Sequence, residues 1–367
     1  MNSSAVTAAL EFLAKTDVPP VRLHAARTLG SPRRFGTIKL LREEAARDMF
    51  ARDVRELFLL PYAEAWKTDR LRGPAAAILG PVLSGNGSVA LDALIARGCL
   101  EPSPAVDILL DGMLERAHPR GYFYEPHERT AAETAAGRPS ELDFLAVTAV
   151  YLRYLVVFGR GRDSRVRDGF DWLVNHQESD GAWRHHAPRH GLESYLLTRR
   201  VAEAFATLPA TALKRWGGAR RRLAGAWSAR ILANCDDPDA VLPHLNVAPD
   251  PRARRRSGAQ LELPASLTDR VLYFALEDLA LALEIGASPK QDHLAVWIEW
   301  LRDSQLTDGS WRLGNPSLRE RLLLSDPNGR LRAEALYLTD EWITLRAAQV
   351  MRAVQPRSRV RAAVPVE

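Results

Sequence analysis

The sequence WLVNHQESDGAW, Trp172 to Trp183, returns near the other end of the chain as WLRDSQLTDGSW, Trp300 to Trp311. Both copies contain Trp-Leu, a glutamine five residues after the first tryptophan, and an Asp-Gly-x-Trp ending. Two copies of so constrained a pattern in one chain indicate supersecondary units that stack on one another. We therefore expect a helical array in which these segments form the turns between helices.

Helical periodicity on either side of these turns predicts units of two helices, an amphipathic outer helix and a more apolar inner helix. The outer helices with their turns are predicted at 105–123, 166–183, 225–243 and 292–311, and the inner helices at 141–158, 192–208, 266–283 and 337–354. No segment has the alternation typical of a strand. The sequence therefore predicts an all-α fold, an α/α toroid of repeated helix pairs with the inner helices forming a ring.

Residues 1–100 are rich in alanine and leucine and have helical periodicity broken by proline and glycine clusters. They form an N-terminal helical segment, either divergent repeats or a separate subdomain. We expect the barrel to occupy residues 101–355 and the tail, 356–367, to be disordered.

Composition places the chain among soluble globular proteins, since 46% of its residues are hydrophobic and 26% are charged. No apolar run approaches the ~20 residues that span a bilayer, and residues 1–17 have no secretory signal pattern. Two cysteines, Cys99 and Cys235, form no disulfide framework, which favours the cytoplasm. The sequence does not exclude contact with a membrane surface by a protein that does not cross it.

Arginine-rich runs at 220–222 and 252–256 dominate the net charge of +5. Such runs are typical of solvated faces, and the alternative is attraction to an anionic partner. No nucleic-acid-binding motif accompanies them, so we do not expect a nucleic-acid partner.

The pattern Gln-x-x-Asp-Gly-x-Trp, at 177–183 and 305–311, resembles the QW motif of the terpenoid cyclase and prenyltransferase superfamily. The resemblance extends more weakly over residues 104–354. The motif works as a brace: glycine permits a left-handed turn, glutamine can satisfy backbone groups at a helix end, and tryptophan covers the junction. Its presence is specific for a fold and does not identify a reaction.

The resemblance implies an α/α barrel whose inner helices line an apolar cavity for an isoprenoid. Class II cyclases of this superfamily carry a DxDD motif at the start of an inner helix, where the middle aspartate protonates the substrate. The matching position here is Glu141-Leu142-Asp143-Phe144, with Asp143 as the acid, Glu141 as its support and Phe144 in place of the last aspartate. The alternative is that both acids complement the dipole at a helix N-terminus.

Acidic residues occur at the starts of the other inner helices as well, accompanied by aromatic residues that could stabilise a carbocation. The substrate-binding candidates are Glu193, Tyr195, Asp269, Tyr273, Asp340, Glu341 and Trp342. Helix capping and a ring of carboxylates at the barrel mouth both account for this pattern. No cofactor is predicted, and Mg²⁺ would be needed only for a diphosphate substrate.

Metal sites of other types are not supported by the sequence. The protein prenyltransferases of the same superfamily hold zinc with Asp, Cys and His, but the chain has no Asp-x-Cys sequence. His185, His186 and His190 are interrupted by Pro188, which prevents helical ligand spacing. Asp236-Asp237-Pro238-Asp239 lies in a predicted turn.

Two functions therefore remain open. One is a terpene cyclase, an isomerase or lyase, that acts on a prenyl or polyprenyl substrate by protonation. The alternative is a non-catalytic α/α-barrel binding or interaction protein that retains the fold.

Overall fold

The computed structural model describes residues 2–29, 32–47, 91–92, 94–96, 98–101, 103–124, 144–184, 191–233, 276–312 and 339–355. Its helices are α1 Asn2–Leu13, α2 Pro19–Thr28, α3 Pro32–Phe35, α4 Ile38–Ala46, α9 Pro104–Glu115, α11 Leu145–Val157, α12 Ser164–Asn175, α13 Gly191–Ala206, α14 Leu213–Ala233, α18 Asp292–Asp303 and α21 Asp340–Ala353. Residues 276–284 and parts of 91–96 are helical too. Within these ranges the only β pairing is an isolated bridge between Ala117 and Phe123, so the all-α prediction is confirmed.

Most predicted helices are present near their predicted bounds, and α14 is the main exception. It begins at Leu213, twelve residues before the start predicted from the sequence. Its buried residues Trp216, Ala219, Leu223 and Trp227 follow helical spacing. The intervening arginines and glycines obscure that spacing in the sequence.

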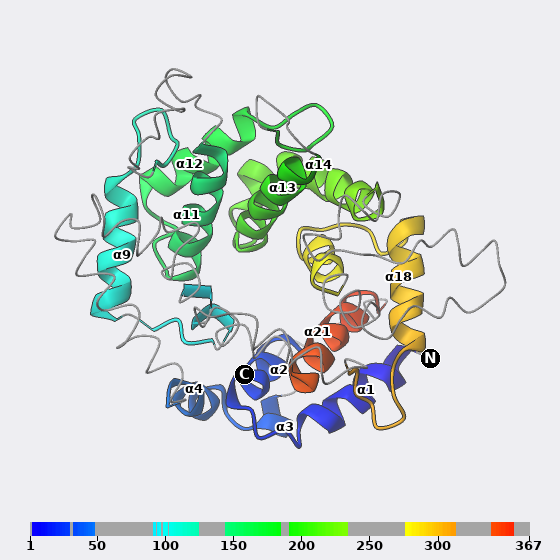
Figure 1. The fold of residues 1–367 in the computed structure, drawn as a ribbon. Helices are drawn as coiled ribbons and strands as arrows, with labels where there is room; N and C mark the ends of the chain where they lie inside the picture. The colour runs from blue at the N-terminus through cyan, green and yellow to red at the C-terminus, as the bar shows by residue number, and fades with distance from the viewer. Residues whose placement is uncertain are drawn as a thin grey trace, which may run out of the picture.

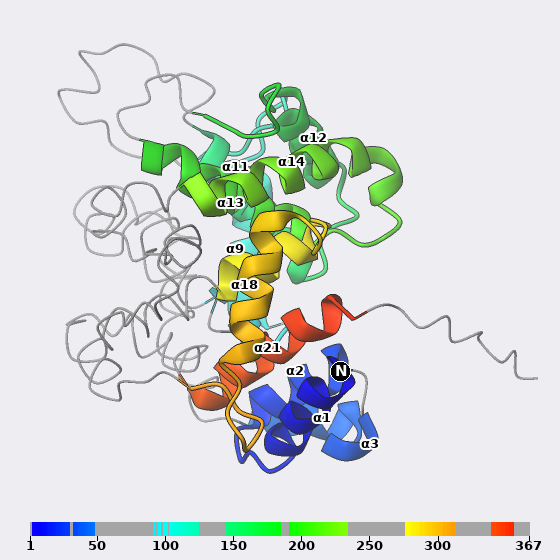
Figure 2. The ribbon, with the colours of Figure 1, turned by 90° about the vertical axis from the view of Figure 1, so that its right-hand side faces the viewer.

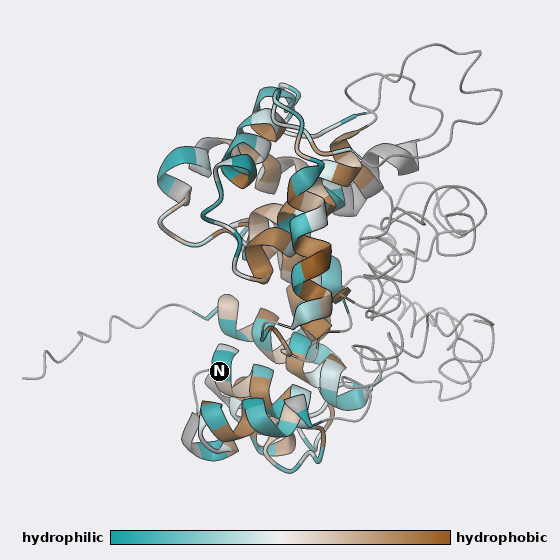
Figure 3. Ribbon diagram, turned by 90° about the vertical axis from the view of Figure 1, so that its left-hand side faces the viewer, coloured by the Kyte–Doolittle hydropathy of each residue, from teal (hydrophilic) through white to brown (hydrophobic). Residues whose placement is uncertain are grey.

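The described helices follow one another around an open ring in Figure 1. Helices α2, α11, α13 and α21 lie nearer its centre, and α1, α9, α12 and α18 lie farther out. Side views show the same helices from two directions (Figures 2 and 3). In Figure 3, which is coloured by hydropathy, many ribbons have one apolar and one polar face. This is the burial pattern expected of amphipathic helices that pack on one another.

The two glutamine-containing turns make the same hydrogen bonds. Gln177 Nε2 donates to the carbonyl oxygens of Gly181 and Ala219, both at 3.0 Å. Gln305 Nε2 donates to those of Gly309 and Ala5, at 3.0 and 2.9 Å. Each glutamine thus closes its own turn and fastens the turn to the next outer helix, a role beyond the helix-end brace predicted from sequence.

The closing tryptophan of each turn is fully buried. Trp183 Nε1 donates to Leu173 O at 2.9 Å, and Trp311 Nε1 donates to Leu301 O at 2.8 Å. The indole thereby satisfies a carbonyl in the last turn of the preceding outer helix, where intrahelical partners run out. The prediction that tryptophan covers the helix junction is confirmed.

A threonine on the following inner helix fixes the other side of each turn. Thr344 Oγ1 accepts from Trp311 N at 3.0 Å and donates to Trp311 O at 3.2 Å. Thr198 makes the equivalent pair with Trp183. This threonine therefore sets the register of an inner helix relative to its turn.

The segment HPRGYF, 118–123, forms a third turn of the same kind although it lacks the glutamine. Phe123 replaces the tryptophan, and Phe123 N donates to Thr148 Oγ1 at 2.9 Å. Its backbone repeats the other turns, since Gly121 N donates to His118 O as Gly181 N donates to Glu178 O. The predicted equivalence of this segment to the later turns is confirmed.

Glycine is required in these turns by backbone conformation and by space. Gly181 and Gly309 have φ of +88° and +86°, where an L side chain is strained. A Cβ on Gly181 would lie 2.4 Å from Arg222 O, and one on Gly309 would lie 2.5 Å from Ala8 O. Only glycine lets the next outer helix come this close.

The N-terminal helices pack against the last unit of the chain. Helix α1 packs on α21, as does α2, and Gln305 and Gly309 contact α1 as Gln177 and Gly181 contact α14. The predicted division into 1–100, 101–355 and a tail stays a prediction, and 356–367 lies outside the described residues.

Substituting Gly181 with alanine should destabilise the protein far more than substituting Gly159, which also has positive φ, +89°, but has open space around it. Gly159→Ala should cost about 1–2 kcal/mol for the left-handed backbone. Gly181→Ala should cost roughly 1–3 kcal/mol more, because its Cβ overlaps the Arg222 carbonyl. Urea unfolding of both variants measures the difference, and equal losses would show that backbone conformation alone selects glycine.

Candidate functional site

The predicted catalytic pair, Glu141 and Asp143, lies outside the described residues, as do Asp269 and Tyr273. Glu193 and Tyr195 lie in the first turns of α13, but the structure describes only their backbone. Asp340, Glu341 and Trp342 are described at the start of α21. The predicted site as a whole therefore stays a prediction.

The start of α21 has the features of a capped helix. Thr339 Oγ1 accepts from Trp342 N at 3.2 Å, and both acids lie in the first turn. Asp340 also lies 3.8 Å from Nε of Arg312, the arginine that follows the Trp311 turn. These contacts favour the capping interpretation for Asp340.

The candidate Trp342 and the aromatic residues that close the turns are enclosed by protein. Phe123 and Trp183 are fully buried in their turns, and Trp342 is 6% exposed. The ring of Trp342 meets His24 edge-on, with 5.6 Å between centroids. These rings therefore contribute to helix packing.

Phe144, the residue that follows Asp143, lies in an aromatic stack at the turn formed by residues 118–123. Its ring stacks on Tyr122 at 5.0 Å, and Tyr122 stacks on His118 at 4.3 Å. Phe144 is also the N-cap residue of α11. Asp143 directly precedes Phe144 in the sequence, and its own position lies outside the described residues.

The most distinctive feature of the inner helices is a set of polar contacts that join neighbours around the ring, and we call it the inner polar belt. Its members are His24, Thr28, Asp92, Ala96, Arg153, Tyr154, Arg199, Arg200, Glu203, Glu277, Asp278, Glu284, Arg346 and Gln349.

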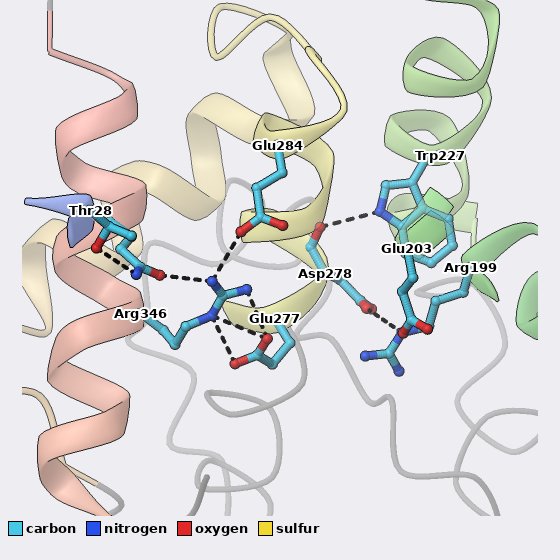
Figure 4. Close-up of polar contacts among 9 residues, drawn as sticks. Thr28, Arg199, Glu203, Trp227, Glu277, Asp278, Glu284 and Arg346 are labelled. Atoms are coloured by element: carbon cyan, nitrogen blue, oxygen red, sulfur yellow. Dashed lines mark hydrogen bonds and ion pairs between the residues drawn. The ribbon is translucent and has the colours of Figure 1, made fainter. Parts of the chain in front are cut away.

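Arg346 of α21 is the centre of one part of the belt (Figure 4). Its guanidinium binds both carboxylate oxygens of Glu277, through Nη2 at 2.9 Å and Nε at 3.1 Å. Nη1 donates to Glu284 and Gln349 at 3.0 and 2.7 Å. Burial of the guanidinium lowers its pKa, but the two carboxylates outweigh this and raise it. The arginine stays charged and ties α21 to segment 276–284.

Glu203 of α13 is the centre of a second part. It lies 3.0 Å from Arg200 and 3.4 Å from Arg199, and Arg199 reaches to 3.7 Å from Asp278 on segment 276–284. Burial of the Glu203 carboxyl raises its pKa, but Arg200, Arg153 and Arg199 together lower it to about 2. The Glu203 carboxylate is therefore ionised and paired with these arginines.

The belt continues through α11 and α2. Arg153 and Tyr154 of α11 both donate to Asp92 Oδ1. His24 of α2 contacts Ala96 O at 2.8 Å. Gln349 of α21 donates to Thr28 of α2 at 2.9 Å, which links the last inner helix to the first. Helices α11 and α13 are coupled through the charge of Arg153, which lowers the pKa of the Glu203 carboxyl.

Sequence analysis did not identify this belt, although a signal was present. Arg153, Glu203 and Gln349 each lie five residues after the threonine that contacts the turn. Polar residues at one repeat position among buried apolar residues, two of them charged, indicate partners in the neighbouring helices. Ion pairs thus lie between the described parts of inner helices that the sequence predicts to be mostly apolar.

The described residues contain neither a cluster of metal ligands nor a membrane-spanning helix. No group of three or more His, Cys, Asp or Glu side chains in the described ranges is arranged to hold a metal ion. None of the helices that the structure describes is long and apolar enough to cross a membrane.

Replacing Arg346 with methionine should destabilise the fold by about 2–3 kcal/mol, because Glu277 and Glu284 lose their partner. The double variant Glu277→Gln/Arg346→Met should recover part of this loss. Arg302→Met, at an exposed position, should change stability by no more than about 0.5 kcal/mol. Additive effects of the two belt substitutions in urea unfolding would contradict the pairing.

The stability of the protein should rise with pH through the range in which His24 titrates. Burial, with smaller effects of Arg27 and Arg346, lowers the pKa of His24 to about 4. The unfolded chain, whose histidine pKa is near 6.5, binds this proton first, so unfolding becomes easier as pH falls from 6.5 to 4.

The His24 contribution should have a slope of up to about 1.4 kcal/mol per pH unit. In His24→Gln, which keeps a donor for Ala96 O, that slope should disappear from the pH dependence of urea unfolding. An unchanged slope would show that other groups cause it.

Comparisons with known proteins do not identify this chain. No family model matches it, and no curated protein matches it. A crystal structure of a protein from Actinoplanes aligns with 17% identity over 96% of this chain and 99% of that chain, with a TM-score of 0.38. A structural similarity at that TM-score does not support a conclusion about the fold or the function of this chain.

Proposed function

We propose that the chain forms a closed α/α toroid of six outer–inner helix pairs of the terpenoid cyclase type. The pairs are α1 with α2, α4 with 91–96, α9 with α11, α12 with α13, α14 with 276–284, and α18 with α21. Three turns of the same geometry and the packing of α1 on α21 support this arrangement. In this proposal residues 1–100 supply divergent repeats of the ring.

We further propose that the toroid is a proton-initiated cyclase for a prenyl or polyprenyl substrate. Asp143 donates its carboxyl proton to an alkene carbon, Glu141 supports it, and the carbocation closes a ring and then loses a proton to a base. The observation that carries this role is the position of Asp143, directly before Phe144 at the N-terminus of α11. The protein acts in the cytoplasm, and its partner is a hydrophobic isoprenoid.

Glu193, Tyr195, Asp269, Tyr273, Asp340, Glu341 and Trp342 are the proposed substrate-side residues at the other inner-helix starts. Counted from the turn-binding threonines, Glu193 precedes Thr198 by five residues, as Asp143 precedes Thr148. Glu193 is therefore the closest positional equivalent of the proposed acid. No step of the proposed reaction passes through a metal ion.

Incubation with prenyl diphosphates and squalene-type polyprenes tests the cyclase proposal. Wild type should give cyclic product, and Asp143→Asn should lose at least about 100-fold in rate because the amide cannot supply the proton. Asp303→Asn is the matched control, since Asp303 is an exposed aspartate at the end of the outer helix α18 and lies outside the proposed site, and it should retain activity. Equal product from wild type and Asp143→Asn would exclude Asp143 as the acid.

The inner polar belt favours a second candidate, a non-catalytic α/α toroid that binds a ligand or partner. Ion pairs between inner helices, such as Arg346 with Glu277, occupy positions that a hydrocarbon-lined cavity would leave apolar. Absence of product with every substrate, together with saturable binding of the same compounds by calorimetry, would support this candidate over the cyclase.

A further inference from the structure

One junction between neighbouring helix pairs differs from the rest because no linker crosses it. It lies where α18 and α21 meet α1 and α2, and we call it the closing junction. Gln305 and Ala5, which are bonded there, are 300 residues apart in sequence, and Gln349 and Thr28 are 321 apart. Its two sides are held together only by non-covalent contacts.

The outer contact of the closing junction differs in one hydrogen bond from its counterpart between α12 and α14. At that junction Gln177 donates to Ala219 O, and Arg222 Nη2 donates back to Gln177 Oε1 at 2.6 Å. At the closing junction Ala8 occupies the place of Arg222 against the turn glycine. A methyl group cannot donate, so the second hydrogen bond of the α12–α14 junction has no equivalent from Ala8.

Two inner contacts of the closing junction join groups without formal charge. Gln349 donates to Thr28 at 2.9 Å, and Trp342 meets His24 edge-on. The adjacent junction, between 276–284 and α21, instead has the charge-assisted bonds of Arg346 to Glu277 and Glu284. Bonds between charged partners are about twice as strong as neutral ones in similar surroundings.

Helix α1 also depends on this junction for its own structure. It has twelve residues, and its buried side chains are Ala5, Val6, Ala9, Leu10 and Leu13. An isolated helix of about 12 residues is marginal in water. Once α1 leaves the Gln305 turn and α21, it therefore loses its helical hydrogen bonds.

We propose that α1 is a detachable strap, and that the ring opens at the closing junction while the other helix contacts persist. Opening there requires no linker to stretch, because the two sides are joined covalently only through the rest of the chain. Use of the opening as an entrance for a ligand rests on the proposed function. The opening itself rests only on the contacts described above.

Native-state hydrogen exchange of the full-length protein in low concentrations of urea tests the strap. Amides of α1 should exchange through an opening of lower free energy and weaker urea dependence than amides of α11 and α13. The measurement uses no ligand, so its outcome is independent of the cyclase assay. If α1 exchanges only with global unfolding, at the same free energy as α11 and α13, the proposal is overturned.

The matched variants Gly309→Ala and Gly181→Ala sharpen the test, because each places a Cβ within 2.5 Å of a backbone oxygen in the next outer helix. Gly309→Ala should raise exchange in α1 at least about tenfold and leave α11 and α13 nearly unchanged. Gly181→Ala should raise exchange in α12, α13 and α14. Equal increases in α1 and α13 in Gly309→Ala would contradict the strap, and if either variant fails to fold, the wild-type measurement decides.

Discussion

The structure depends on the contact between a glycine in each turn and a backbone carbonyl of the next outer helix. At Gly181 and Gly309 that approach leaves no room for a side chain. The glutamine amide bonds across the same gap, the tryptophan fixes the preceding helix, and threonine fixes the inner helix. One turn of seven residues thus orients three helices, which explains why so specific a pattern is repeated.

The turns determine how each outer helix is placed against its neighbours. The inner polar belt determines how the inner helices are placed against one another. Apolar packing is non-directional, but an ion pair such as Arg346 with Glu277 is formed only in one register of the two helices. Paired charges in the belt are therefore suited to specify which inner helices are neighbours. Because these charges are already paired with one another, they are not available to bind a ligand.

Much of the fold could be predicted from the sequence, because the Trp172–Trp183 pattern set the phase of the repeat and the phase located the helices. Helix α14 was misplaced because its glycines and arginines mask the spacing of Trp216 and Trp227. The belt was missed because the partners of Arg199 and Arg346 lie far away in the sequence. The role of Asp143 rests on motif position, and such a position is shared by a catalytic acid and a helix cap.

The most direct test of the ring is whether α1 occupies the place of an outer helix beside the last turn. The methyl group of Ala8 lies against Gly309 in the structure. Nuclear Overhauser spectroscopy with selectively labelled alanine and glycine should show a cross-peak between the Ala8 methyl protons and the Gly309 α protons. Its absence, when the equivalent contact of Gly181 with the Cβ protons of Arg222 is observed, would contradict closure of the ring by α1.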